Sequence, residues 1–218
     1  SRSSAASDVY KRQVMRTLAL LMLASFTMSA YSASKTILVL GDSLSAEYGL
    51  ARGEGWVNLL QKKLEAEKIT ASIVNASISG ETTSGGAARL QTLLDKHQPA
   101  VVVIELGAND ALRGLSLIAT QQNLRNMVAA AKKAKARVLL IGMQIPPNYG
   151  TDYTRQFADL FPKIAKESKS ALVPFMLKDV ADKANPNLFQ ADRIHPSAEA
   201  HPIILNNIWP QLKPLLSK

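Results

Sequence analysis

Short apolar runs rich in β-branched residues alternate along this chain with segments of helical periodicity, and this alternation restricts the possible folds strongly. Five runs predict buried strands, at residues 36–40, 71–75, 100–106, 137–141 and 171–175. Helical segments are expected at residues 56–68, 87–97, 117–136, 153–168 and 197–216. Strands that alternate with helices pair in parallel, with helices on both faces of one sheet. We therefore predict a single α/β domain, a three-layer α/β/α sandwich.

The expected order of the five parallel strands is 2-1-3-4-5, as in flavodoxin-like folds. Pro174 in the last run places that strand at an edge of the sheet. In this order the chain winds in opposite directions from the first and third strands, so a crevice opens beyond their carboxyl ends. We therefore expect the functional residues in the loops that follow these strands.

The first 34 residues are interpreted as a targeting segment and not as part of the fold. Basic residues precede a short apolar run, and small residues follow it, which is the order of a secretory signal peptide. The run is short for a membrane span, and an uncleaved anchor is the alternative. We expect an upstream extension at 1–14, a signal peptide at 15–34, and a folded domain at 35–218 that is periplasmic or secreted, without a stable membrane anchor.

Composition and charge exclude several kinds of site. The chain of 218 residues contains no cysteine, which rules out disulfide frameworks, thiolate metal sites and cysteine nucleophiles. The formal net charge is +9, but the basic residues are scattered, and no basic stripe is interleaved with aromatic residues. We therefore expect no nucleic-acid partner.

Four short segments, far apart in the sequence, carry residues suited to acyl transfer. They are residues 41–45, 75–80, 107–110 and 192–196. The first three each follow a predicted strand, and the fourth precedes the final helix. Ester hydrolysis by serine requires a nucleophile, a base, a carboxylate that orients the base, and further hydrogen-bond donors. Each segment alone has a structural explanation, but their joint occurrence at one predicted edge indicates ester hydrolysis.

Ser43 is the candidate nucleophile because it lies two residues after Gly41, where a sharp turn exposes its hydroxyl. In isolation it could instead cap the next helix, and the segment lacks the Gly-x-Ser-x-Gly pattern of α/β-hydrolases. His195 is the candidate base, because Pro196 holds it in an extended or turn conformation. Asp192, three residues upstream, can orient the imidazole and stabilise its cation.

Negative charge on a tetrahedral intermediate requires donors aimed at its oxygen, worth about 3–4 kcal/mol each. We predict three donors: the backbone amides of Ser43 and Gly80 and the side-chain amide of Asn109. In isolation Asn109 could be a turn residue and Gly80 a positive-φ turn. The other histidines, His97 and His201, are expected to be structural or solvated.

The four segments resemble the sequence blocks of the SGNH, or GDSL, hydrolase superfamily, which carry Ser, Gly, Asn and His in this order. The corresponding residues are Ser43, Gly80, Asn109 and His195, with Asp192 in the Asp-x-x-His position. The neighbouring sequence is also similar to the exported bacterial thioesterase I, lysophospholipase and arylesterase group. The resemblance implies an acyl enzyme on the serine, substrates that are short to medium acyl esters, thioesters, lysophospholipids or aryl esters, and no metal or organic cofactor.

The substrate pocket is expected beside the nucleophile and in the loops 111–118 and 145–153, after the third and fourth strands. Its candidate residues are Asp42, Leu44, Glu47, Leu112, Leu115, Ile145, Pro146 and Ile194. Glu47 stands where the family commonly has a small residue, and Ala108 and Arg193 each replace a frequent glycine. Glu47 and Arg193 are expected to narrow the entrance or to alter its charge.

Two other functions are left open by the sequence. The same machinery could deacetylate carbohydrate, although an acyl chain needs an apolar trough whereas a sugar needs polar groups and a stacking aromatic residue. The apolar side chains of the two loops favour the trough. A non-catalytic lipid carrier could share the fold, but a carrier does not need all five catalytic groups. We therefore predict a monomeric serine esterase whose partner is a small-molecule or lipid acyl ester or thioester.

Overall fold

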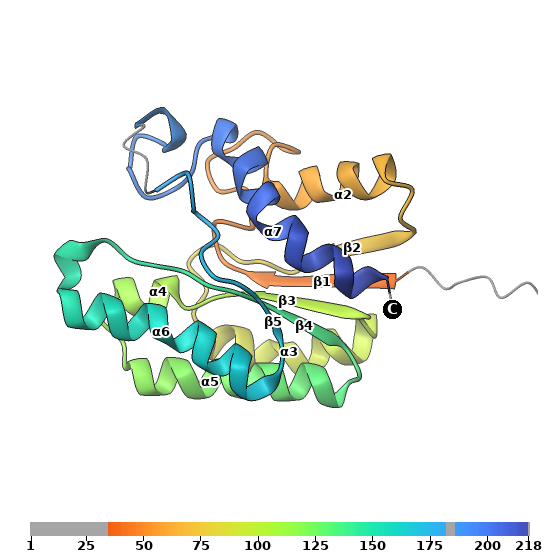
Figure 1. Ribbon diagram of the computed structural model, residues 1–218, viewed down its shortest axis with the longest axis horizontal. Coiled ribbons are helices and arrows are strands. Elements are labelled where there is room, and N and C mark those ends of the chain that lie inside the picture. The colour runs from red at the N-terminus through yellow and green to blue at the C-terminus, as the bar shows by residue number, and fades with distance from the viewer. Residues whose placement is uncertain (1–34, 182–185, 218) are drawn as a thin grey trace, which may run out of the picture. The chain divides into compact units, whose positions relative to one another are not determined.

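The computed structural model describes residues 35–181 and 186–217, and shows five parallel strands in one sheet (Figure 1). The strands are β1 Lys35–Gly41, β2 Ala71–Asn75, β3 Val101–Glu105, β4 Arg137–Ile141 and β5 Ala171–Val173. Their order is β2-β1-β3-β4-β5, which confirms the predicted order and places β5 at an edge. The predicted upstream extension and signal peptide, residues 1–34, lie outside the described residues.

Helices cover both faces of the sheet, which confirms the three-layer α/β/α sandwich (Figure 1). The longer helices are α2 Trp56–Ala66, α3 Thr83–His97, α5 Leu117–Lys133, α6 Thr151–Ser168 and α7 His201–Leu216. Helices α2 and α7 lie together on one face, and α3, α5 and α6 lie on the other. Over the ranges given above, no helix is long and apolar enough to cross a bilayer, and no cluster of three side chains suited to hold a metal ion is found.

Short helical segments interrupt the loops at the carboxyl edge of the sheet. They are α4 Ala108–Leu112 and the 3₁₀ turns Pro147–Tyr149, Pro186–Leu188 and Ala198–Ala200. The expected loop at 111–118 therefore begins inside a helix, which was not predicted. Gly107 has a φ of 119°, so the chain can leave β3 and enter α4 at once.

Helix α3 begins four residues before its predicted start because its N-terminal signal is polar. Thr82 caps the helix by accepting a hydrogen bond from the Gly85 amide at 3.3 Å. The first turn carries small side chains, so hydrophobic periodicity does not reveal it. Gly86 allows close packing on the sheet, because a Cβ there would lie 2.3 Å from Leu106 Cδ1.

The core lies on both sides of the central strands. The side chains of β1 from Ile37 to Leu40 and those of β3 from Val101 to Ile104 are fully buried. A parallel sheet with helices on both faces requires such continuous apolar runs, which is why the strands were identifiable in the sequence. The buried strands fix the positions at which the site loops leave the sheet.

His201 joins the two helices that share a face of the sheet. The Trp56 amide, at the start of α2, donates to His201 Nδ1 at 3.0 Å. His201 is only 2% exposed, and burial lowers its pKa to about 4, against the opposing charges of Glu47 and Glu54. The imidazole therefore stays neutral in the folded protein and serves as a structural acceptor.

The lowered pKa of His201 predicts a loss of stability in mild acid. In the unfolded chain His201 binds a proton below pH 6.5, whereas in the folded chain it binds one only below about pH 4. The free energy of unfolding therefore falls as the pH decreases between these values. The shift corresponds to a loss on the order of 3 kcal/mol. In His201→Asn, which keeps an acceptor oxygen for Trp56, urea denaturation at about pH 7.5 and about pH 4.5 should show a smaller decline than in the wild type. An equal decline in both proteins would contradict the assignment.

Candidate active site

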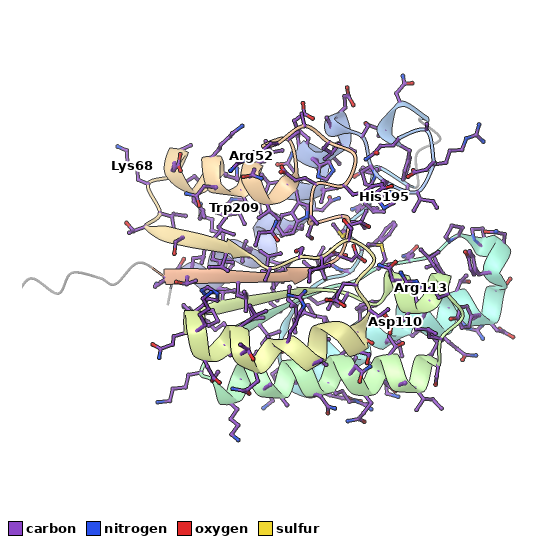
Figure 2. The ribbon with its side chains drawn as sticks, turned by 180° about the vertical axis from the view of Figure 1, so that it is seen from behind. Arg52, Lys68, Asp110, Arg113, His195 and Trp209 are labelled. Carbon is purple, nitrogen blue, oxygen red and sulfur yellow. The ribbon has the colours of Figure 1, made fainter. Side chains whose placement is uncertain are left out.

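The carboxyl edge of the sheet brings the four predicted segments together. Ser43 follows β1, Gly80 follows β2, and Asn109 lies in the first turn of α4 after β3. The segment that carries His195 precedes α7. Figure 2 shows His195 at the same end of the molecule as Arg113 of the Asn109 segment. Parallel strands share one carboxyl edge, so the sequence order of strands and motifs produces this convergence.

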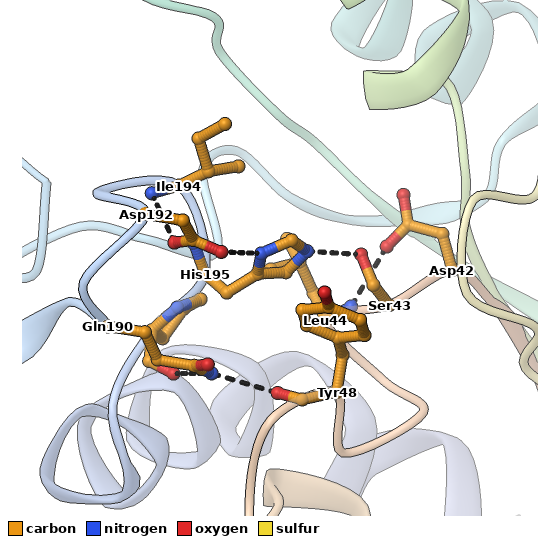
Figure 3. Close-up of polar contacts among 9 residues, drawn as sticks. Asp42, Ser43, Leu44, Tyr48, Gln190, Asp192, Ile194 and His195 are labelled. Carbon is orange, nitrogen blue, oxygen red and sulfur yellow. Dashed lines mark hydrogen bonds and ion pairs between the residues drawn. The ribbon is translucent and has the colours of Figure 1, made fainter.

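Ser43, His195 and Asp192 form a continuous line of hydrogen bonds (Figure 3). Ser43 Oγ lies 2.9 Å from His195 Nε2, and His195 Nδ1 lies 2.6 Å from Asp192 Oδ2. The other oxygen of Asp192 accepts from the amides of Ile194 at 2.9 Å and His195 at 3.0 Å. The turn therefore holds its own carboxylate, and the carboxylate holds the imidazole toward the serine, as in serine hydrolase triads.

The charge of Asp192 is fixed by the same hydrogen bonds. Burial acts to raise its pKa, but the amides of His195 and Ile194 and the His195 ring together lower it to about 2. The carboxylate is therefore ionised throughout the neutral range. An ionised carboxylate at this position favours the imidazolium that forms when the serine loses its proton.

The three predicted oxyanion donors are arranged with their N–H groups available. Asn109 Nδ2 donates one hydrogen to Asp42 Oδ2 at 3.0 Å, which fixes the carboxamide, and its second hydrogen meets no acceptor among the described residues. In the part of the chain that the structure describes, the backbone amides of Ser43 and Gly80 donate to no protein acceptor. Gly80 has a φ of 77°, a conformation that glycine adopts without strain. Donors of this kind can bind an oxyanion.

Arg113 supports two of these donors from outside. Its Nη2 donates to the Gly80 carbonyl at 2.9 Å and to Asn109 Oδ1 at 3.5 Å. One guanidinium thus contacts the Gly80 carbonyl and the Asn109 carboxamide, and adds a positive charge to this side of the site. Sequence reasoning assigned Arg113 no role. The available signal was its spacing of four residues from Asn109, which puts both on one helical face.

Tyr48 and Gln190 hold His195 from the other side, and neither was singled out in the sequence (Figure 3). The Tyr48 ring lies against the imidazole, with 4.3 Å between ring centroids and 37° between ring planes. Gln190 Nε2 donates to the carbonyls of Tyr48 at 2.8 Å and Pro196 at 3.0 Å. These contacts tie the loop after β1 to the loop that carries the base.

A buried acidic residue, Glu105, lies beneath the nucleophile at the end of β3. Its Oε2 accepts from Ser45 Oγ at 2.7 Å and from the Asp42 amide at 3.2 Å. Burial, and then the charge of Asp42, raise the pKa of Glu105 well above its usual range. Burial also raises the pKa of Asp42 to about 6, against the hydrogen bond from the Leu44 amide. Sequence reasoning did not single out Glu105, although it is a lone charge at the end of an apolar strand.

The predicted pocket residues differ in exposure. Asp42, Leu44 and Ile145 are buried, and Leu112 is partly buried against the core. Pro146, Leu115 and Ile194 are exposed, the last two at 44% and 55%. The buried residues therefore lie beneath the surface of the carboxyl edge, whereas the exposed residues are accessible to a ligand.

Glu47 is part of the loop that follows the nucleophile. Its Oε1 accepts from the amides of Gly53 at 3.1 Å and Gly55 at 2.7 Å. Burial opposes ionisation, but these hydrogen bonds lower the pKa of Glu47. Gly55 caps α2, so the carboxylate stabilises the connection between β1 and α2. Its effect on the entrance stays a prediction.

The large hydrophobic side chains that the structure leaves exposed gather at this edge. Within the described ranges they are Tyr48, Ile78, Leu115, Ile118, Tyr149 and Ile194. All six lie in loops or first helical turns that follow strands, or in the segment before α7. Apolar groups gathered in this way mark ligand grooves or interaction surfaces.

Comparison with known proteins identifies one family and several similar sequences. The chain matches the GDSL-like lipase/acylhydrolase family over residues 39–203. It is 49% identical to esterase TesA of Pseudomonas aeruginosa, over 89% of this chain and 96% of the relative. It is 43% identical to thioesterase 1/protease 1/lysophospholipase L1 of Escherichia coli, over 85% and 87%.

A solved structure extends the comparison to the fold. The crystal structure of the psychrotrophic esterase EstA from Pseudoalteromonas, inhibited by monoethylphosphonate, superposes with a TM-score of 0.79 and 43% identity. The match covers 85% of this chain and 100% of the esterase. Sequence and fold therefore agree over nearly all of the described residues, and the chain belongs to the GDSL-like lipase/acylhydrolase family.

Proposed function

We propose that the protein is a serine esterase that hydrolyses short- to medium-chain acyl esters and thioesters through an acyl enzyme on Ser43. The proposal is carried by the hydrogen-bonded line Asp192–His195–Ser43, with distances of 2.6 Å and 2.9 Å. Ser43 attacks the carbonyl carbon while His195 takes its proton, and His195 then protonates the leaving alcohol or thiol. A water molecule then attacks the acyl carbonyl while His195 takes its proton. His195 returns this proton to Ser43 as the carboxylic acid is released.

The oxyanion of each tetrahedral intermediate is bound in this proposal by the amides of Ser43 and Gly80 and by the Asn109 carboxamide. Before substrate arrives, Asp42 and Arg113 hold the Asn109 carboxamide, and Arg113 also donates to the Gly80 carbonyl. Preorganised donors of this kind contribute about 3–4 kcal/mol each to stabilisation of the transition state. Every proton is accepted and returned by His195, so the steps require no metal or organic cofactor.

Two observations support an acyl substrate. Esterase, thioesterase and lysophospholipase appear in the names of relatives that share more than 40% of their residues with this chain. The exposed apolar side chains at the carboxyl edge, including Leu115 and Ile194, offer contacts to an alkyl chain. The chain is a carboxylic-ester hydrolase by family. We propose that the acyl portion of its substrate binds to these exposed apolar side chains, the apolar rim of the site.

We also infer export of a monomer to the periplasm or beyond. The order of basic, apolar and small residues in the N-terminal segment supports a signal peptide. Lys35 is the first residue of β1, so removal of residues 1–34 leaves the sheet complete. The substrate is then a small-molecule or lipid ester outside the cytoplasm.

The function is tested with purified protein and a panel of acyl donors. We expect hydrolysis of p-nitrophenyl butyrate, with the highest kcat/KM at short or medium chain length and activity on acyl-CoA thioesters. Acetylated xylan is the control for carbohydrate deacetylation. Release of acetate from xylan alone would favour that alternative, and absence of hydrolysis across the panel would favour a carrier.

A further inference from the structure

Glu105 is a buried titratable group that the mechanism does not use. It is 2% exposed and ends β3, directly opposite Gly41 of β1 in the parallel register. A Cβ at Gly41 would lie 2.7 Å from Glu105 Oε2 and 2.8 Å from Ser45 Oγ. The glycine before the nucleophile therefore makes room for the Glu105 side chain and its partner.

The hydrogen bonds around Glu105 have a defined direction. The Trp56 indole, which can only donate, gives its hydrogen to Ser45 Oγ at 3.1 Å. Ser45 passes its own hydrogen to Glu105 Oε2 at 2.7 Å, and the Asp42 amide donates to the same oxygen at 3.2 Å. Both groups that donate to Glu105 thus belong to residues 42–45, the nucleophile segment.

The rest of the nucleophile segment is fixed through Asp42 and Ser45. Asp42 Oδ1 accepts from the Leu44 amide at 3.0 Å, and Oδ2 accepts from Asn109 at 3.0 Å. The Ser45 carbonyl accepts from Asn75 Nδ2 at 2.8 Å. Ser43 therefore lies between Asp42 and Ser45, which Glu105 anchors. Asp42 also holds the Asn109 carboxamide.

The surroundings of Glu105 disfavour a second negative charge beside Asp42. Burial and the charge of Asp42 raise its pKa, and contact between the two carboxyl groups favours ionised Asp42 and protonated Glu105. A protonated acid accepts the two hydrogen bonds with its carbonyl oxygen. An ionised one would place a further negative charge below the site where the oxyanion develops.

We propose that Glu105 is a positioning residue of the esterase reaction, whose carboxyl group holds the nucleophile segment so that Ser43 meets His195 and Asn109 faces the oxyanion. The inference rests on the proposed function of Ser43. Glu105 touches no substrate, and it acts through Asp42 and Ser45. Loss of this anchor should therefore affect turnover more than substrate binding.

The test compares two substitutions of nearly equal size. Glu105→Gln keeps an uncharged acceptor oxygen, and its kcat on p-nitrophenyl butyrate should stay within about 3-fold of wild type. Glu105→Leu leaves the Ser45 hydroxyl and the Asp42 amide without an acceptor, and kcat should fall about 30- to 100-fold with KM within about 3-fold. The matched control is Leu94→Ala, a buried position in the last turn of α3, away from the site, which should lose stability but keep its kcat.

Three outcomes would overturn the inference. They are wild-type turnover in Glu105→Leu, an equal loss in Glu105→Gln and Glu105→Leu, or an equal loss of kcat in the control. Ser43→Ala is measured alongside, because its inactivity does not depend on Glu105. If Ser43→Ala is inactive while a Glu105 variant gives a contrary outcome, only the positioning role of Glu105 fails; if Ser43→Ala is active, the proposed function itself fails. If Glu105→Leu does not fold, Ser45→Ala replaces it and should lose about 3- to 10-fold in kcat, since one of the two anchoring hydrogen bonds remains. Wild-type kcat in Ser45→Ala would equally overturn the inference.

Discussion

Ser43→Ala will abolish ester hydrolysis and leave the fold intact. The Ser43 hydroxyl, 2.9 Å from His195 Nε2, is the proposed nucleophile, and the nearby Ser45 hydroxyl is already bonded to Glu105. Removal of a serine nucleophile costs about 10⁶-fold in kcat in hydrolases of this mechanism. Ser43 is only partly buried, so the midpoint of thermal unfolding should change little.

The measurement combines rates with covalent labelling. Initial rates on p-nitrophenyl butyrate are compared with those of Ser84→Ala, a control at an exposed position of α3. An alkyl phosphonate ester should add one phosphonyl group to the wild type and to the control, and none to Ser43→Ala. Residual activity near the wild-type level, or labelling of Ser43→Ala, would remove Ser43 from the mechanism.

Asp192→Asn is expected to lower kcat by about 10⁴-fold. The carboxylate has a pKa of about 2, so the wild-type enzyme presents a full negative charge to His195 Nδ1. An asparagine side chain can still accept the amides of Ile194 and His195, so the turn should persist. It supplies no charge for the imidazolium, and its amide hydrogens favour the tautomer that cannot accept the serine proton.

The matched control for Asp192→Asn is Asp152→Asn. Asp152 forms an exposed ion pair with Arg155 at 2.8 Å, and loss of such a pair has little effect. Steady-state kinetics should show a large drop in kcat for the first variant and unchanged kcat for the second. A turnover within about tenfold of wild type in Asp192→Asn would mean that the carboxylate does not orient the base.

Much of the fold could be predicted because each strand is buried on both faces. The continuous apolar runs that became β1 and β3 followed from this burial, and the helical segments between them then required parallel pairing. The site motifs could be located because Ser43 and Asn109 each come directly after such a run. Functional residues that follow a strand can therefore be located in a sequence when the strand itself can be recognised.

The supporting contacts could not be predicted, because they depend on register and on distant partners. Glu105 meets Ser45 only because β1 and β3 pair with Gly41 opposite Glu105. Gln190 and Tyr48 are 142 residues apart, and neither carries a local signal. Helix α4 was missed because it spans only five residues, too few to show a hydrophobic period.

The Asp192–His195 pair lies within a single turn that stabilises its own carboxylate, and this compactness bears on how such enzymes diversify. The segment after β4, with Ile145 and Pro146, contributes none of the proposed catalytic groups. Its exposed part, from Pro146 onward, can lengthen, shorten or change composition over evolutionary time without disturbing the spacing on which proton transfer depends. New acyl specificities can therefore arise at one side of the rim while the reaction chemistry is inherited unaltered.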